Sequence, residues 1–349
     1  MPTHNNTPLR GRGTSANPRN RFERLEVELD EPRTEGPKTQ FLRDTARSII
    51  ATNQSPDLPF DASLNPYRGC EHGCTYCYAR PTHEFLGFSA GLDFESRILI
   101  KEEAPALLRH ELAAPGWQPK VLAMSGVTDA YQPVERRLRL ARGCLEVLAE
   151  TRHPVLVVTK NALVARDADL LAELARHDAA AVLISVSSLD GDFLRRLEPR
   201  TPHPRERFKA MRRLAEAGVP VGVLVAPIVP GCSDHEIPQV LAAAADAGAS
   251  FARYTLLRLP GIVAELFDTW LQENFPDRRD KVLNRVRSLR GGRLNDPRFG
   301  YRFHAQGPFA EQVRGLFAMS CRRLGLTVDP PALSTAAFRR PGGDQLTLF

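Results

Sequence analysis

The sequence predicts an α/β fold in which parallel strands alternate with helices, and three observations support this. Short apolar runs alternate with helical patterns from about residue 64 to residue 259. The runs are almost continuously apolar, which is typical of strands buried on both faces of a parallel sheet. Polar residues gather where the runs end, and ligands bind at the carboxyl ends of strands in such folds.

The elements follow one another regularly along this region. Apolar or β-branched runs predict strands at residues 121–124, 154–160, 181–187, 219–229 and 251–257. Helices are expected between them at residues 133–149, 168–177, 205–218 and 237–248. In the first helix Leu138, Cys144 and Leu148 recur at helical spacing, and the third ends at Gly218, a residue type common at helix ends.

Composition predicts further parts on either side of this region. Residues 1–55 are rich in Pro, Asn, Arg, Gly and Thr, which predicts a flexible basic arm. Strict alternation at residues 25–29 fits a short edge strand within it. We therefore divide the chain into this arm, a sheet-and-helix domain, a basic helical extension and a flexible tail, at residues 1–55, 56–270, 271–335 and 336–349.

Bulk properties exclude several classes of protein. The chain has 349 residues, 42% of them hydrophobic, which is enough for a large core. No apolar run approaches the roughly 20 residues of a membrane span, and the first residues lack the apolar segment of a secretory signal. Six cysteines in so long a chain do not make a disulfide framework. We expect a cytoplasmic protein without a membrane partner.

Positive charge is concentrated near both ends. Residues 278–340 contain 14 Lys and Arg against four acidic residues, and residues 1–21 contain four arginines and no acidic residue. A polyanion such as nucleic acid is the natural partner of a basic face, through neutralisation of its phosphates. A solvated basic surface is the alternative interpretation.

Three cysteines within eight residues, Cys70, Cys74 and Cys77, are the strongest chemical signal. Cysteine thiolates hold the iron of iron–sulfur clusters. Three thiolates without a fourth leave one iron of a four-iron cluster open, as in catalytic metal sites that keep a free position. A structural zinc site, with His72 or His83 as the fourth ligand, is the alternative, although the second cysteine pair usual in such sites is missing.

Residues 65–80 resemble the CxxxCxφC loop of radical S-adenosylmethionine (radical SAM) enzymes, with Tyr76 at the aromatic position of the cofactor site. The branch that contains spore photoproduct lyase is the most similar, through residues 68–78, 128–129, 158–160, 184–187 and 197–201. The resemblance implies a partial (β/α)6 barrel and a 4Fe–4S cluster held by the three cysteines. It also implies S-adenosylmethionine at the open iron, where the family cleaves it to a 5′-deoxyadenosyl radical.

The same resemblance assigns residues to the cofactor. Thr128 and Asp129 would receive its amino group, Lys160 would approach its carboxylate, and Ser185 or Ser187 would meet the ribose. The residues alone leave other interpretations open, because Asp129 is also suited to cap the next helix and Lys160 to lie in a solvated loop.

One departure from the lyases concerns the hydrogen donor. Those enzymes carry a cysteine shortly before the aspartate of this loop, and residues 124–129 contain none. Cys144, on the following helix, is expected to be buried. Tyr76, Tyr78 and Tyr131 are the candidates for relaying a radical in its place, and we take Tyr78 and Tyr131 as the candidate catalytic residues.

The last five residues, 345–349, are similar to the QLxLF peptide by which bacterial polymerases and repair proteins dock on the DNA sliding clamp. Leu346, Leu348 and Phe349 would supply the apolar contacts, and Gln345 would fix the orientation by hydrogen bonds. A terminus that folds back on its own domain is the alternative.

These features lead to one main hypothesis and two others. The main one is a radical SAM enzyme that acts on nucleic acid and repairs a modified or cross-linked DNA base, which would have to leave the base stack. The second keeps the chemistry but takes RNA, a protein or a small molecule as substrate. The third is a non-enzymatic iron–sulfur protein that binds DNA and is tethered to the clamp.

Overall fold

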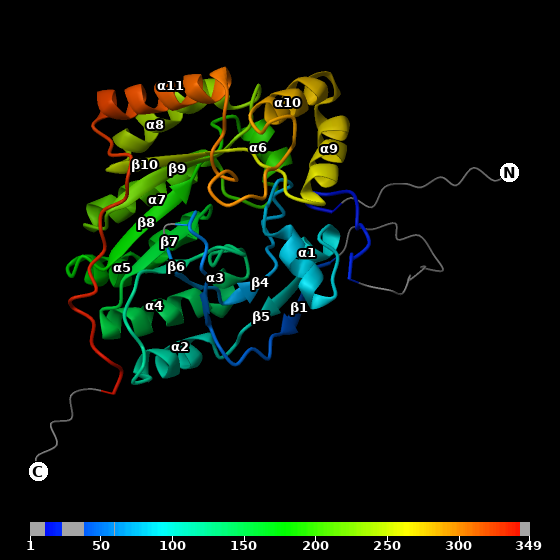
Figure 1. Cartoon of the computed structure of the whole chain (residues 1–349). Coiled ribbons are helices and arrows are strands. Elements are labelled where there is room, and N and C mark those ends of the chain that lie inside the picture. The colour runs from blue at the N-terminus through cyan, green and yellow to red at the C-terminus, as the bar shows by residue number, and fades with distance from the viewer. Residues whose placement is uncertain (1–10, 23–37, 59, 343–349) are drawn as a thin grey trace, which may run out of the picture.

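A seven-stranded sheet forms the centre of the computed structural model, which describes residues 11–22, 38–58 and 60–342 (Figure 1). Its strands, in spatial order, are β10 (Phe251–Leu256), β9 (Val221–Ile228), β8 (Ala180–Ser185), β7 (Val155–Thr159), β6 (Leu122–Met124), β3 (Ala62–Leu64) and β2 (Ile50–Thr52). The first six of these run parallel, and β2 pairs antiparallel with β3 at the edge. This confirms the α/β fold and the six parallel strands of a partial (β/α)6 barrel.

Helices connect the parallel strands and run around the outside of the curved sheet (Figure 1). They are α4 (Leu140–Thr151), η2 (Ala162–Asp167), α5 (Ala168–Ala175), α6 (Gly191–Leu197), α7 (Pro204–Glu216), η3 (Asp234–Glu236) and α8 (Ile237–Asp246). All six residues of β8 are buried, as expected for a central strand covered on both faces. The core of the domain lies between this sheet and the helices.

The expected elements differ from the observed ones at two places. The helix expected at residues 133–149 is broken into α3 (Glu135–Leu138) and α4, because Arg139 adopts a left-handed backbone conformation with φ of 56°. The strand expected at residues 181–187 ends at Ser185, so Ser187 lies in the loop after β8. The short first strand β3 and the helix α2 (Ala104–Ala113) were not predicted.

A second, three-stranded sheet stands beside the barrel and carries the cysteine loop. It contains β1 (Gln40–Arg43), β5 (Arg97–Ile100) and β4 (Tyr67–Arg68), with β5 in the middle. The cysteines follow β4 and precede the helical turn η1 (Arg80–Leu86), and α1 (Leu92–Ser96) leads into β5.

The first described residues lie on the cysteine loop. Gly13 accepts a hydrogen bond from the Thr75 hydroxyl at 2.9 Å, and Thr14 is buried. A Cβ atom on Gly13 would lie 1.6 Å from the Gly73 carbonyl oxygen, so only glycine fits this approach. The flexible arm predicted from composition is therefore wrong for residues 11–22, which pack on the body. The strand expected at residues 25–29 falls outside the described residues.

Three helices complete the C-terminal part, namely α9 (Val263–Asn274), α10 (Pro276–Ser288) and α11 (Pro308–Leu324). The first two form a second apolar core with α6, centred on Phe193, Phe267 and Trp270. Residues 334–340 then run back over the barrel helices, where the Arg339 amide donates to the Thr151 carbonyl at 2.9 Å. The tail predicted to be flexible from residue 336 thus begins with residues that contact the body.

Two further predictions concern the ends of the chain and the membrane. The clamp-like peptide, residues 345–349, falls outside the described residues, so docking on a clamp stays a prediction. Among the described helices, none combines the length and the apolar character that a membrane crossing requires.

Candidate functional site

The cysteine loop lies at the carboxyl-terminal side of the parallel sheet. Cys70 and Cys74 are buried, Cys77 is partly exposed, and all three are free thiols. The Cys70 amide donates to the Phe94 carbonyl at 2.9 Å, which ties the loop to α1. Gly73 has a φ of 66°, in the region that favours glycine, and lets the chain turn between the first two cysteines.

Arg80 holds this loop from inside. Its guanidinium is fully buried and donates to the carbonyls of Gly73 at 3.2 Å and Cys74 at 3.0 Å. The same group also reaches the carbonyls of Ala90 and Gly91, and it pairs with the Glu95 carboxylate at 3.0 Å. Four of its five hydrogen bonds thus hold backbone carbonyls of this region and the fifth holds Glu95, which preorganises the cysteines.

The surroundings of the three thiols fit an iron–sulfur cluster. Burial, and then the Glu198 carboxylate, raises the pKa of the Cys74 thiol, whereas the Lys160 ammonium lowers it. Burial also raises the pKa of Cys77, against the effect of Arg80 and Lys160. Two cations therefore stand where anionic thiolates bound to iron need compensation. No three His, Cys, Asp or Glu side chains of the described residues converge on a single metal ion, and a multi-iron cluster does not require it because each thiolate binds a different iron.

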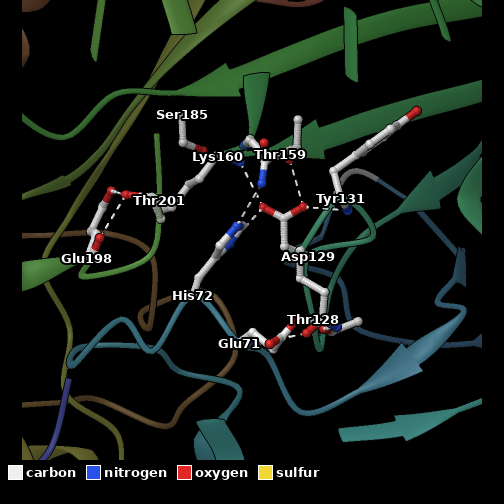
Figure 2. Close-up of polar contacts among 12 residues, drawn as sticks. Glu71, His72, Thr128, Asp129, Tyr131, Thr159, Lys160, Ser185, Glu198 and Thr201 are labelled. Atoms are coloured by element: carbon white, nitrogen blue, oxygen red, sulfur yellow. Dashed lines mark hydrogen bonds and ion pairs between the residues drawn. The ribbon is translucent and has the colours of Figure 1, made fainter. Parts of the chain in front are cut away.

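Asp129, in the loop that follows β6, joins several neighbouring groups of the site (Figure 2). Its carboxylate accepts hydrogen bonds from the Thr159 hydroxyl at 2.7 Å, the Lys160 amide at 2.8 Å and the Tyr131 amide at 2.9 Å. Burial would raise its pKa, but His72 and these hydrogen bonds hold the pKa of Asp129 at about 2. The carboxylate is therefore ionised and joins β6 to β7. With its oxygens committed to the protein, Asp129 positions the neighbouring groups.

His72 connects the cysteine loop to Asp129. Its Nδ1 lies 3.4 Å from the Asp129 carboxylate, and its Nε2 lies 3.2 Å from the Asn161 amide nitrogen. Burial lowers the pKa of His72, but Cys70 and Asp129 outweigh burial and raise it to about 10. The imidazole is thus a spacer of fixed orientation between the loop and the strand ends. His83, the other zinc-ligand candidate, is buried beside Phe88 and Phe94.

Glu198 forms a second buried centre on the other side of Lys160. It accepts hydrogen bonds from the hydroxyls of Tyr76 and Ser187 and pairs with the fully buried Arg207 at 2.7 Å. Burial would raise its pKa, but Arg207 and Lys160, helped by the two hydroxyls, hold the pKa of Glu198 at about 2. This anion fixes the ring of Tyr76 between the second and third cysteines.

The structure separates the predicted cofactor residues into committed and available groups. Thr128 donates to the Gly69 carbonyl at 2.6 Å, and Ser187 donates to Glu198. Lys160 Nζ lies 5.7 Å from the centre of the Tyr76 ring and has no hydrogen bond or ion pair within the described residues. The Ser185 hydroxyl also lacks a partner in this part of the chain, and it lies on the same side as Lys160 (Figure 2). Lys160 and Ser185 are therefore the groups available to a bound molecule.

The two candidate catalytic tyrosines lie in different places. Tyr78, next to Cys77, is 49% exposed at the rim of the site, with its ring 4.9 Å from the Arg258 guanidinium. Tyr131 points away from the cysteine loop and donates to Asp167 at 3.1 Å in the main core (Figure 2). A catalytic role for Tyr131 stays a prediction, and the backbone turn that offers its amide to Asp129 sends its ring away from the cysteine loop. Cys144 is fully buried in the same core, as expected.

Sequence reasoning missed several residues that build the site. Arg80, Glu198 and Arg207 bear buried charges that are neutralised only in the folded chain. Glu71 was also missed, and its carboxylate accepts from the Val134 amide at 2.7 Å and from Arg200 at 2.8 Å. The available signals were the position of Glu71 inside the cysteine loop and the stretch 197–201, which contains Glu198.

Comparisons with known proteins agree with this geometry. The family model of the Radical SAM superfamily matches residues 64–244. The chain is 36% identical over 244 residues to the uncharacterized protein Rv2578c of Mycobacterium tuberculosis, covering 68% of this chain and 71% of that protein. It is 25% identical over 249 residues to the uncharacterized protein MJ0683 of Methanocaldococcus jannaschii, covering 71% of this chain and 89% of that protein.

Among solved structures, the fold is similar to that of spore photoproduct lyase complexed with dinucleoside spore photoproduct. The TM-score is 0.59 at 16% identity, covering 82% of this chain and 81% of that one. At this level of identity the likeness concerns the fold.

Proposed function

The chain belongs to the radical SAM superfamily, and from this premise we propose that it acts on nucleic acid and repairs a modified or cross-linked base in DNA. The family implies a 4Fe–4S cluster and S-adenosylmethionine as cofactors. When bound, these two groups supply a radical that abstracts a hydrogen atom from the substrate. The protein's part is to hold them, to exclude water and to present the base.

The residues of the site divide this work. Cys70, Cys74 and Cys77 would hold the cluster, and Arg80 keeps their loop in one conformation. Lys160 is the cation available to the carboxylate of S-adenosylmethionine, and Ser185 is the hydroxyl available to its ribose. Asp129 fixes the backbone of Lys160 through the 2.8 Å hydrogen bond from its amide. Direct contact of Asp129, Thr128 or Ser187 with the cofactor stays a prediction, and in this structure their side chains bond to other residues of the protein.

The observation that carries the nucleic-acid proposal is the continuity between the cysteine loop and the basic C-terminal part. Arg258, after the end of β10, lies with its guanidinium over both Tyr78 and Phe303, at 4.9 and 4.6 Å from the ring centres. Phe303, within the basic segment of residues 278–340, thus lies next to the residue that follows Cys77. The fold likeness to a protein bound to a dinucleoside photoproduct supports the same substrate class.

The reaction differs from that of the photoproduct lyases in one respect. Residues 124–129 supply no cysteine, and Cys144 is buried in the main core. Tyr78 remains as the candidate for relaying the radical, because it follows Cys77 directly and its ring is partly exposed.

The test is an anaerobic assay of the reconstituted protein with dithionite and S-adenosylmethionine. The measured quantity is 5′-deoxyadenosine, with UV-irradiated DNA, with unirradiated DNA and without DNA. We expect irradiated DNA to increase the product and Cys74→Ala to abolish it. Product that is indifferent to all DNA would contradict the nucleic-acid proposal and direct the search to RNA, a protein or a small molecule.

A second proposal concerns residues 345–349. Gln345, Leu346, Leu348 and Phe349 would dock on a DNA sliding clamp, which would bring the enzyme to replicated or repaired DNA. A labelled peptide of this sequence should bind a purified bacterial clamp, and a peptide with Leu348 and Phe349 changed to alanine should not. Equal binding of the two peptides would contradict it.

A further inference from the structure

A cavity of about 340 Å³ lies in the segment that joins α10 to α11. Three arginines line it, Arg290, Arg293 and Arg298, together with Tyr301, His304 and one acidic residue, Asp296. We call it the arginine cavity. It belongs to none of the groups that hold the cysteine loop.

Arg290 is the unusual residue of this cavity. Its side chain is buried, with only 5% of the residue exposed, and it donates to the carbonyls of Arg302, Leu256 and Leu257 at 3.1 to 3.3 Å. Its Nε is buried and has no hydrogen-bond partner among the described residues. Burial, and then the charge of Arg258, lowers the pKa of Arg290 to about 10. A buried cation with an unused donor is costly, and an anion in the cavity would offset that cost.

The other charges of the cavity leave it positive. The single acidic residue, Asp296, is already paired with Arg298, whose Nη2 lies 2.7 Å from its carboxylate. Arg293 is exposed and makes no side-chain hydrogen bond or ion pair with the described residues. Arginine binds phosphate through a planar fork of donors, and two arginines here retain unused ones.

Aromatic rings extend from the cavity to the cysteine loop. Arg258 stands over Tyr78 and Phe303, and Arg302 stands over Phe303 and Phe299 at 5.1 and 4.9 Å. Phe299 and Tyr301 are 61% and 46% exposed. Exposed rings beside arginines are what single-stranded nucleic acids use, because bases stack on the rings while cations follow the backbone. A free phosphate ion would make no use of these rings.

The segment is held in place before any ligand binds. Asp57 accepts from the Gly300 amide at 2.6 Å and pairs with Arg302 at 2.8 Å. Arg302 also donates to the Ser55 hydroxyl. These contacts with the turn between β2 and β3 fix the rings relative to the barrel, which lowers the entropic cost of binding.

We propose that the arginine cavity binds a backbone phosphate of an unpaired nucleic-acid strand while Tyr301 and Phe299 stack on its bases. The strand then runs along the arginine–aromatic series towards Tyr78, so that a nucleotide beyond the bound phosphate reaches the cysteine loop. The substrate class rests on the proposed function, whereas the cavity as a strand-binding site is testable apart from it.

The test is the binding of a fluorescent 12-nucleotide thymidine strand to the reconstituted protein, measured by anisotropy at several salt concentrations. Arg293→Gln should weaken binding several-fold and reduce the slope of log affinity against log salt by about 0.7, the value for one contact with a single strand. Tyr301→Ala should weaken binding about tenfold through lost stacking. The matched control is Arg213→Gln, which removes from α7 another exposed arginine without an ion pair among the described residues and should change neither quantity.

Several results would overturn the proposal. One is that Arg293→Gln and Tyr301→Ala both bind the strand as tightly as the wild type. Another is that Arg213→Gln loses as much affinity for the strand as Arg293→Gln, which would indicate a general effect of surface charge. Competition by inorganic phosphate or thymidine monophosphate as strong as by the strand would indicate a small-anion site instead. A ribonucleotide strand that binds tighter than the DNA strand would keep the cavity but direct the proposed function to RNA.

The two proposals fail separately. If irradiated DNA stimulates cofactor cleavage but the variants bind the strand normally, the cavity proposal fails and the function stands. If strand binding depends on Arg293 and Tyr301 but no DNA stimulates cleavage, the cavity stands and the DNA-repair function fails.

Discussion

The cysteine loop and the arginine cavity use the same residue type in opposite ways. Around the loop, Arg80 and Arg207 are fully buried and each is paired with a buried carboxylate, Glu95 or Glu198. In the cavity, Arg290 is buried, and its Nε has no hydrogen-bond partner in the part of the chain that the structure describes. The first set of arginines is satisfied by the protein and serves to hold the chain. The second leaves donors unused, which is the property of a surface that receives an anion.

Lys160 is the exception within the first region. Asp129, Glu198, Arg80 and Arg207 are all paired there, but the Lys160 ammonium has no ion pair within the described residues and lies over the Tyr76 ring. Because its donors are not used by the described part of the chain, Lys160 resembles Arg290 and Arg293 of the cavity more than Arg80 and Arg207. The comparison therefore predicts that variants of buried, paired residues lose stability and that variants of residues without an ion pair lose binding.

Arg80→Met should show the largest effect. It removes five hydrogen bonds, leaves carbonyls of the loop unsatisfied and leaves the buried Glu95 without its cation. Breaking a buried ion pair costs about 3–5 kcal/mol, and orphaned carbonyls add to it. Urea unfolding of the variant should show that loss, with a lower iron content after reconstitution. Arg80→Lys, which keeps the charge but not the fork of donors, should fall between. If Arg80→Met were as stable as the wild type, the buried arginine pairs would not be what holds the cysteine loop.

Glu198→Gln should lower the free energy of unfolding somewhat less than Arg80→Met does. The substitution keeps the shape and can keep the hydrogen bonds from Tyr76 and Ser187, but it leaves the fully buried Arg207 unpaired. The expected loss is about 3 kcal/mol in the free energy of unfolding. Glu206→Gln is the matched control, because Glu206 pairs with Lys209 at 2.8 Å on an exposed face of α7. Equal losses of unfolding free energy in the two variants would show that burial does not determine how much an ion pair stabilises this protein.

Lys160→Met should affect binding and leave folding nearly unchanged. The methionine keeps an apolar stem over Tyr76 and removes only the ammonium. A hydrogen bond to a charged group is worth about 1.5–3 kcal/mol, so affinity for S-adenosylmethionine should fall about tenfold to a hundredfold. Equilibrium dialysis with the reconstituted protein measures this, and Lys160→Arg should restore part of it. A stability loss with unchanged affinity would move Lys160 to the class of paired, structural charges.

The sequence predicted the parts of this picture that are encoded locally. Apolar runs predicted the parallel strands from β6 to β10, and the spacing of Cys70, Cys74 and Cys77 predicted the cluster loop. The pairs that hold the loop join residues whose meeting depends on the completed fold, as in Arg80 with Glu95, or Gly13 against Gly73. No local pattern marks them. Tyr131 shows the same limit, since only the backbone turn after Asp129 decides that its ring enters the core.

Arg109→Ala should have the smallest effect and sharpens the comparison most. Arg109 makes a two-pronged ion pair with Glu150, both bonds at 2.5 Å, so its pairing geometry is as good as that of Arg80. The two side chains are 48% and 44% exposed, however, and water screens such pairs to about 0–1 kcal/mol. Urea unfolding should therefore show a loss below about 1 kcal/mol, because the exposed partner is solvated when the arginine is removed. A loss as large as that of Arg80→Met would mean that pairing alone, whether buried or not, stabilises this protein. The small loss we expect would show that it is burial which turns an arginine pair into a structural element.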